Sequence, residues 1–167
     1  MDEPVGSDRE RVAELLGREP RGAYEVVVRD VSGDPVVLRN SPFLDDGTPM
    51  PTRYYLVGEA LVKAVSRVEA VGAVDEVEAE LGHELIADIH RRYEQERDAA
   101  IDDDHVGHRP SGGVGGTRVG VKCLHAHVAH HLAVGDDAIG QWTLNRVPVD
   151  TPGRPPMPGD PTPEIES

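Results

Sequence analysis

One short stretch of the chain carries most of the side chains that could do chemistry. Residues 119–134, VGVKCLHAHVAHHLAV, hold the only cysteine and four of the eight histidines, with Lys122 as the one charged side chain. At about 100° per residue, a helix over this stretch would place Cys123, His127 and His130 on one face. The opposite face would be apolar, formed by Val121, Leu124, Val128 and Leu132. We therefore predict a buried central helix with a Cys/His site along one side.

A thiolate and imidazoles at these spacings could converge on one borderline-soft cation. Zinc accepts sulfur and nitrogen ligands in tetrahedral geometry, so the Cys/His face predicts a zinc site. We favour a set built from Cys123, His130 and His90, with a further histidine of the helix assisting. Water could fill a remaining position. The candidate ligands are Cys123, His90, His125, His127, His130 and Asp30.

Two other interpretations of the same residues stay open. The histidines could only pack beside a small buried Cys123, which would make the domain a structural or protein-interaction module without metal. Alternatively, Cys123 close to a helix N-terminus, with a histidine as base, could be the nucleophile of an enzyme that acts on a small ligand. Ligand atoms that converge on one point would favour the metal site. Histidine rings bonded to backbone carbonyls would favour the structural module. An open pocket above Cys123 would favour the enzyme.

The glycine-rich residues 112–122, GGVGGTRVGVK, lead into the predicted helix and could hold an anion. Backbone N–H groups at a helix N-terminus, together with Arg118 and Lys122, are suitable donors to a phosphate. The segment does not match a P-loop, because Cys123 follows the lysine where Ser or Thr is required. A flexible loop that delivers the chain to the helix is the simpler interpretation, and a small phosphorylated ligand is the weaker alternative.

The remaining sequence predicts the elements that must position this helix. Residues 24–29 and 35–39 read as a β-hairpin with a Gly-containing loop, and residues 53–57 could add a third strand. Apolar residues at helical spacing and glycine stops predict helices over residues 8–16, 59–72, 74–81 and 85–101, and a short one capped by Asp136 that contains Ile139, Trp142 and Leu144. We therefore expect a single, mainly helical α+β domain.

The domain is expected to span residues 8–146. Residues 1–7 are predicted to be a flexible N-terminus. The last segment, 147–167, is rich in proline and acidic residues, so it is predicted to be a disordered tail that packs no core.

Composition restricts the partners of this protein. The net charge of −14 and pI near 4.8 argue against nucleic acid and anionic membranes, because affinity for polyanions comes mainly from Lys and Arg. We find no signal-peptide pattern and no apolar run long enough to span a membrane, so we expect a soluble cytoplasmic protein. A single cysteine excludes an intramolecular disulfide. A protein partner is compatible with the sequence, which does not indicate an oligomeric state.

Several separated motifs also give the chain a family likeness. They are GREPRG at 17–22, DGTPMPTRYYL at 46–56, SRVEAVG at 66–72, HRRYEQERD at 90–98, and VKCLHAHVAHHLA followed by GDDAIG at 121–140. In this order the chain resembles, over residues 16–142, the bacterial and largely actinobacterial family of unknown function numbered 501. The resemblance implies no established activity.

The family pattern bears on the candidate site. As the resemblance implies, it covers the positions of Lys122, Cys123, His125, His130, His90, Tyr93 and the Asp46–Pro49 turn, while those of His127 and His131 vary. Many relatives carry a cysteine in place of Asp30, and some carry Cys or His in place of Gly58. If those residues hold a metal in the relatives, this chain has a carboxylate in place of one ligand and lacks the other.

Overall fold

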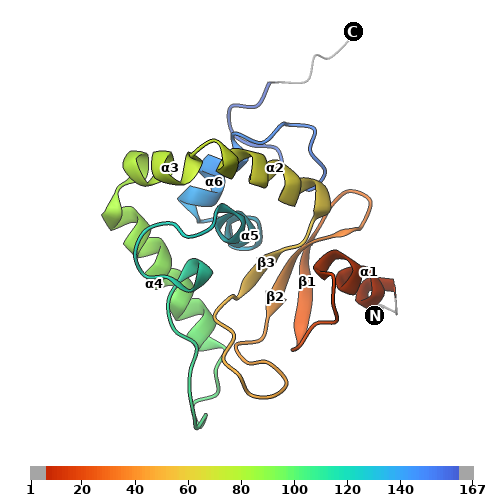
Figure 1. Cartoon of the computed structure of the whole chain (residues 1–167), viewed down its shortest axis with the longest axis vertical. Helices are drawn as coiled ribbons and strands as arrows, with labels where there is room; N and C mark the ends of the chain where they lie inside the picture. The colour runs from red at the N-terminus through yellow and green to blue at the C-terminus, as the bar shows by residue number, and fades with distance from the viewer. Residues whose placement is uncertain (1–6, 162–167) are drawn as a thin grey trace.

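Helices and strands follow one another along the chain in the order that the sequence predicts. The computed structural model describes residues 7–161, which form a mainly helical α+β fold with six α-helices and one three-stranded sheet (Figure 1). The elements are α1 (Ser7–Leu16), β1 (Tyr24–Arg29), β2 (Pro35–Asn40), β3 (Tyr54–Leu56), α2 (Glu59–Ala70), α3 (Ala73–Leu81), α4 (His83–Ala99), the 3-10 turn η1 (Val114–Gly116), α5 (Leu124–Val134) and α6 (Ala138–Leu144). The prediction of a mainly helical α+β domain with an N-terminal sheet is confirmed.

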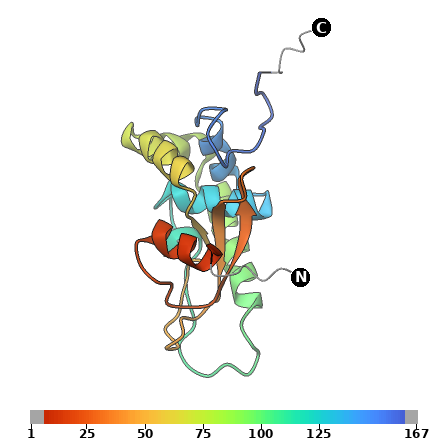
Figure 2. The same cartoon turned by 90° about the vertical axis from the view of Figure 1, so that its right-hand side faces the viewer.

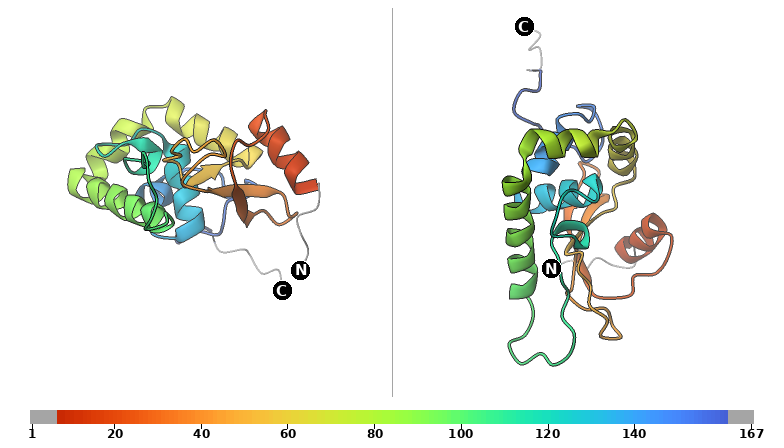
Figure 3. Two further views of the ribbon diagram at one scale, coloured as in Figure 1. Left: turned by 90° about the horizontal axis from the view of Figure 1, so that it is seen from below. Right: turned by 60° about the vertical axis from the view of Figure 1, so that its left-hand side comes forward.

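The sheet separates α1 from the other helices. Its strands are antiparallel in the order β1-β2-β3, so β2 lies in the middle with its apolar residues buried. Successive side chains of a strand point to opposite faces. Leu38 packs with Val12 of α1, whereas Val37 joins Leu56 in the larger core beneath α5. Figure 3 shows α1 on one side of the strands and the helical cluster on the other.

Helix α5 lies at the centre of the helical cluster. It packs against β3, α2 and α6, and its buried residues include Leu124, Val128 and Ala129 as well as two histidines. Ala129 is small enough to allow a neighbouring element to approach closely. The helix ends at Gly135, whose left-handed backbone (φ 88°) is the expected C-terminal stop. A buried central helix is therefore correct, although its start is not.

The predicted helix over residues 119–134 begins five residues later than expected. Gly120 has a left-handed φ of 67°, and Cys123 has an extended backbone at the N-cap position of α5. An extended N-cap residue does not follow the 100° rotation of the helix. The helical spacing that placed Cys123 beside His127 and His130 therefore does not apply.

Two side chains of α4 fix the start of β3 and two nearby loops. The buried Tyr93 hydroxyl accepts the backbone N–H groups of Arg53 and Tyr54, at 2.6 and 3.1 Å. The fully buried Arg97 guanidinium donates to the carbonyls of Pro51 and Gly112. These bonds tie the loop before β3 and the loop after α4 to one helix. Figure 2 shows the loop after α4 at one end of the molecule and the C-terminal segment at the other.

The segment after α6 packs on the domain, which differs from the predicted disordered tail. Val147 and Met157 belong to the main core cluster. The Arg154 side chain is almost fully buried and donates to the carbonyl of Leu144 and to the Asp160 carboxylate. Proline prevents regular secondary structure, but it also lowers the conformational entropy of the unfolded chain. A few buried side chains can therefore be enough to order a proline-rich segment. Residues 1–6 and 162–167 lie outside the described residues.

We expect Met157→Ala to lower the free energy of unfolding by about 2 kcal/mol, because it removes a buried side chain from the core. The matched control is Val149→Ala in the same segment, where the side chain is 56 % exposed. That change is expected to alter stability by less than about 0.5 kcal/mol. Chemical denaturation measures both. Two equally small effects would contradict the packed segment and restore the disordered tail.

Candidate metal centre

The polar side chains on and around α5 form two separate groups. One consists of Glu69, Cys123 and His125, which are partly exposed. The other, around His127 and His130, is buried. The single Cys/His face that we predicted is therefore divided.

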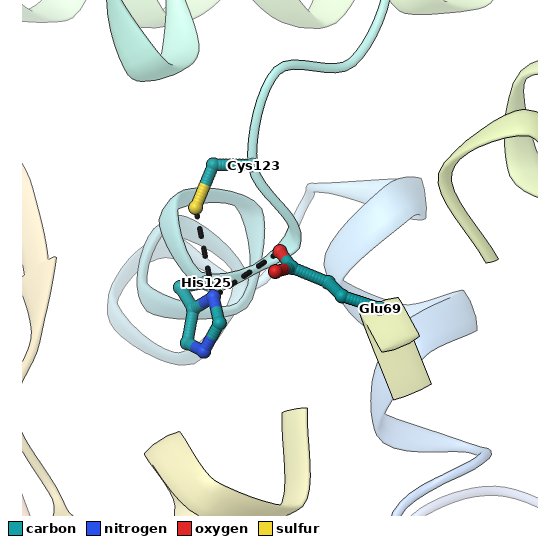
Figure 4. A group of neighbouring side chains, drawn as sticks. All are labelled: Glu69, Cys123 and His125. Atoms are coloured by element: carbon teal, nitrogen blue, oxygen red, sulfur yellow. Dashed lines mark hydrogen bonds and ion pairs between the residues drawn. The ribbon is translucent and has the colours of Figure 1, made fainter. Parts of the chain in front are cut away.

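The first group brings three different ligand atoms to one place. His125 Nδ1 lies 3.6 Å from Cys123 Sγ and 3.1 Å from Glu69 Oε1. The three ligand atoms all lie within 4.8 Å of one another. Figure 4 shows the thiol and the carboxylate on two sides of the imidazole, both directed at Nδ1. Such an arrangement can share a proton or a metal ion.

Glu69 reaches this group from the last turn of α2. Its Oε1 accepts the backbone N–H of Leu124 at 2.7 Å, which is one of the free N–H groups at the start of α5. The residue was not among our candidate ligands. A signal was present, because an acidic side chain in the last turn of a helix opposes the helix dipole. The N-terminus of α5 offsets that repulsion, but only the fold shows the contact.

The second nitrogen of His125 is held by the backbone of α2. His125 Nε2 lies 3.2 Å from the carbonyl oxygen of Val62 and 3.1 Å from Ser66 Oγ. A carbonyl can only accept, so Nε2 carries a proton, and Nδ1 is the nitrogen that can bind a metal. Metal-binding histidines usually donate their other N–H to a carbonyl or carboxylate in this way.

The surroundings of His125 favour positive charge. Its hydrogen bond with Cys123 and then the charge of Glu69 raise the pKa of His125 to about 9, although burial opposes the shift. Without a cation, a proton on Nδ1 is thus held between sulfur and carboxylate. A metal ion would replace that proton with a larger positive charge at the same point.

Two of the three distances between ligand atoms are close to those of tetrahedral zinc, and the third pair, sulfur and oxygen, lies within 4.8 Å. Zinc bonds of about 2.3 Å to sulfur and 2.0–2.1 Å to nitrogen or oxygen place neighbouring ligand atoms about 3.3–3.6 Å apart at tetrahedral angles. The sulfur-to-nitrogen distance of 3.6 Å falls at the upper end of this range, and the 3.1 Å between nitrogen and oxygen requires only a small widening.

A cavity of about 330 Å³ borders the same group. Cys123 and His125 line it, together with Lys122, Tyr54 and Val62. Three protein ligands leave one tetrahedral position for water or a substrate, as catalytic zinc sites do. The cavity gives a small molecule access to the side chains that would hold the metal.

The second group is centred on Asp137, which is fully buried. Asp137 Oδ2 lies 2.8 Å from Nδ1 of both His127 and His130. Its Oδ1 accepts the N–H groups of Ile139 and Gly140 and so caps α6, a role that we had assigned to Asp136. Burial alone would raise the pKa of Asp137, but the two histidines hold the pKa well below its ordinary value.

This network excludes most of the predicted ligands from a common site. His127 and His130 use Nδ1 on Asp137, and the buried Nε2 of His127 has no hydrogen-bond partner among the described residues. His90 accepts the Val114 N–H on Nδ1 and donates from Nε2 to the Gly120 carbonyl at 2.7 Å. Both of its nitrogens are therefore taken, and the predicted set of Cys123, His130 and His90 is not assembled.

Asp30 also lies elsewhere. It is in the turn between β1 and β2, where its Oδ1 accepts the N–H groups of Ser32 and Asp34. Asp30 and Gly58 line one cavity and Cys123 lines another. The structure therefore does not bring Asp30 to the Glu69–Cys123–His125 group.

The predicted anion site is filled by carboxylates of the chain itself. Glu78 Oε1 accepts the N–H of Val121 at 2.9 Å, just as Glu69 accepts that of Leu124. Arg118 is exposed and pairs with Glu94, and Lys122 is exposed at the rim of the cavity beside Cys123. The Val121 and Leu124 N–H groups are thus bound by carboxylates of the chain and do not need a phosphate.

Comparison with known proteins agrees with the family likeness of the sequence. Residues 26–145 match the model of the family described as protein of unknown function (DUF501), so the chain belongs to this family. No curated protein and no solved structure matches the chain. Separately, none of the helices in the described part is long and apolar enough to cross a membrane.

We expect Asp137→Asn to lower the free energy of unfolding by about 3 kcal/mol at neutral pH, because it removes a buried charge from two histidines. Since the pKa of Asp137 is depressed in the folded protein, its stabilisation is present above about pH 4 and is lost as the pH falls further. Denaturant unfolding between neutral and acid pH measures both effects.

The control is Asp136→Asn, which changes an exposed neighbour that pairs with Arg92. An exposed ion pair contributes at most about 1 kcal/mol, so this variant should stay close to the parent. Equal losses in the two variants would show that Asp137 has no special role. The same conclusion would follow if the parent protein lost no stability as the pH is lowered past about 4.

Proposed function

We propose that the protein binds one zinc ion through Glu69, Cys123 and His125. The observation that carries the proposal is the convergence of a thiol, an imidazole and a carboxylate from two helices on one point, at distances close to those of a tetrahedral zinc site. The proposal keeps Cys123 and His125 from the predicted ligand set. Glu69 replaces its other members, which are His90, His127, His130 and Asp30.

The donor set supports zinc over other common metals. Calcium and magnesium prefer oxygen ligands only, whereas a thiolate with an imidazole selects a softer ion. The Leu124 N–H and the Val62 carbonyl are the outer contacts that orient the ligands, because the first holds Glu69 and the second holds His125.

A zinc ion here would join the end of α2 to the start of α5. It would also have one coordination position to spare, beside the cavity lined by Cys123 and His125. The bound ion would supply Lewis-acid chemistry, while Lys122 at the rim would attract an anionic group. A small metal-dependent domain is thus the function that the geometry supports best.

Elemental analysis of zinc-saturated and dialysed protein tests the site. We expect about one zinc per chain, and affinity at least about 100-fold lower in Cys123→Ser and in Glu69→Gln, since each loses a ligand. The control is Glu78→Gln, the same change at a glutamate that also accepts a backbone N–H but has no thiol beside it. It should bind zinc like the parent.

Two results would contradict this site. Zinc-free parent protein after saturation would exclude the metal. A loss in Glu78→Gln equal to that in Glu69→Gln would show that only the hydrogen bonds of these glutamates to the backbone matter. Circular dichroism of each variant, recorded without metal, separates loss of ligand from loss of fold.

A reactive thiol is the second candidate function. It is favoured by the partial exposure of Cys123, its position in a cavity and the proximity of Sγ to His125 Nδ1. In an enzyme of this kind the positive charge of the protonated His125 would stabilise the thiolate that attacks a small ligand. The two candidates compete for the same sulfur atom, so one experiment can separate them.

Alkylation of Cys123 by iodoacetamide, followed by mass spectrometry, makes that separation. If zinc binds the sulfur, zinc at 100 times its Kd should slow alkylation about 100-fold, and a chelator should restore the rate. If the pair is a nucleophile instead, zinc should leave the rate unchanged, and His125→Gln should slow alkylation of the metal-free protein.

A further inference from the structure

Another cavity lies beside the sheet, and none of the proposed zinc ligands lines it, although Tyr55 borders both this cavity and the one at the metal centre. It is about 130 Å³ in volume, is partly open to solvent, and is bordered by the turn after α1, by β1 and β2, and by the loop that follows β2. Part of its wall is apolar and is formed by Leu16, Leu38 and Met50. The space is close to the roughly 150 Å³ that holds a benzene molecule in a dry protein cavity.

Aromatic side chains are concentrated around this cavity. The chain has only six Phe, Tyr and Trp residues, and three of them, Tyr24, Phe43 and Tyr55, line it. Phe43 is held by stacking on His105, with ring centroids 4.2 Å apart and planes inclined by 26°. Aromatic walls favour the edges or faces of another ring. The cavity is therefore matched to a flat, apolar body.

Two arginines add positive charge at the same place. Arg18 and Arg21 both line the cavity, no acidic residue does, and neither arginine forms an ion pair within the described residues. The pKa of Asp46 is lowered mainly by its hydrogen bonds with Thr48 and, to a smaller extent, by the charge of Arg21. In a chain with a net charge of −14, two uncommitted guanidinium groups beside one cavity are a local exception.

We propose that this cavity binds a small aromatic carboxylate. The ring would lie among Tyr24, Phe43 and Tyr55, and the carboxylate would accept hydrogen bonds from the guanidinium groups of Arg18 and Arg21. A planar guanidinium matches a carboxylate in geometry and charge. The site shares none of the proposed zinc ligands, so it does not rest on the proposed function.

Benzoate is the probe, and titration followed by NMR of the aromatic side chains is the measurement. We expect saturable binding with a Kd on the order of 1 mM, the range open to a ligand of this size, with the largest shifts at Tyr24, Phe43 and Tyr55. Benzyl alcohol, which keeps the ring without the charge, should bind at least about tenfold more weakly.

The double variant Arg18→Gln/Arg21→Gln should weaken benzoate binding about tenfold or more. Neither arginine has a side-chain hydrogen bond within the described residues, so the variant should fold, which thermal unfolding checks. The matched control is Arg67→Gln, at an exposed arginine of α2. Equal affinity for benzoate and benzyl alcohol, affinity unchanged in the double variant, or no saturable shift at the three rings would each overturn the proposal.

Discussion

The carboxylate of Asp137 determines which histidines of α5 are structural. A buried carboxylate must receive hydrogen bonds on both oxygens, and it does so from two imidazoles and from two N–H groups at the start of α6. His127 and His130 are thereby fixed, and α5 is tied to α6. His90 is fixed in turn by Val114 and Gly120. Of the polar residues on α5, His125 is then the one that faces a thiol.

The proposed metal centre lies where two helix ends meet. The negative charge of Glu69 is unfavourable at the C-terminal end of its own helix, α2, but favourable beside the N-terminal end of α5. Its Oε1 accepts the Leu124 N–H and faces His125. A thiol and a carboxylate around one imidazole form an arrangement that stabilises a cation. That is why the pKa of His125 rises and why the same geometry would accept a metal ion.

Much of the fold could be predicted from periodicity and from glycine. Gly72, Gly82 and Gly135 end or separate helices where the sequence indicates, and the hairpin and β3 follow from β-branched and aromatic runs. The start of α5 could not be predicted, because an apolar run with glycine before it does not show where the extended backbone ends and the helix begins. That error of five residues put Cys123 on the wrong side of the helical wheel.

The rest of the site depends on contacts between distant parts of the chain. Glu69 and Leu124 are 55 residues apart, and nothing local to SRVEAVG shows that α2 ends at the start of α5. The burial of Met157 likewise depends on a surface that only the folded core provides. Side chains on a single predicted helix could be grouped by spacing, whereas partners from another helix could not.

X-ray absorption at the zinc edge of the zinc-loaded protein tests the central claim most directly. The account predicts one sulfur neighbour at about 2.3 Å together with nitrogen and oxygen neighbours at about 2.0–2.1 Å, four ligands in all. Zinc surrounded only by nitrogen and oxygen would contradict it, because the metal would then lie away from Cys123.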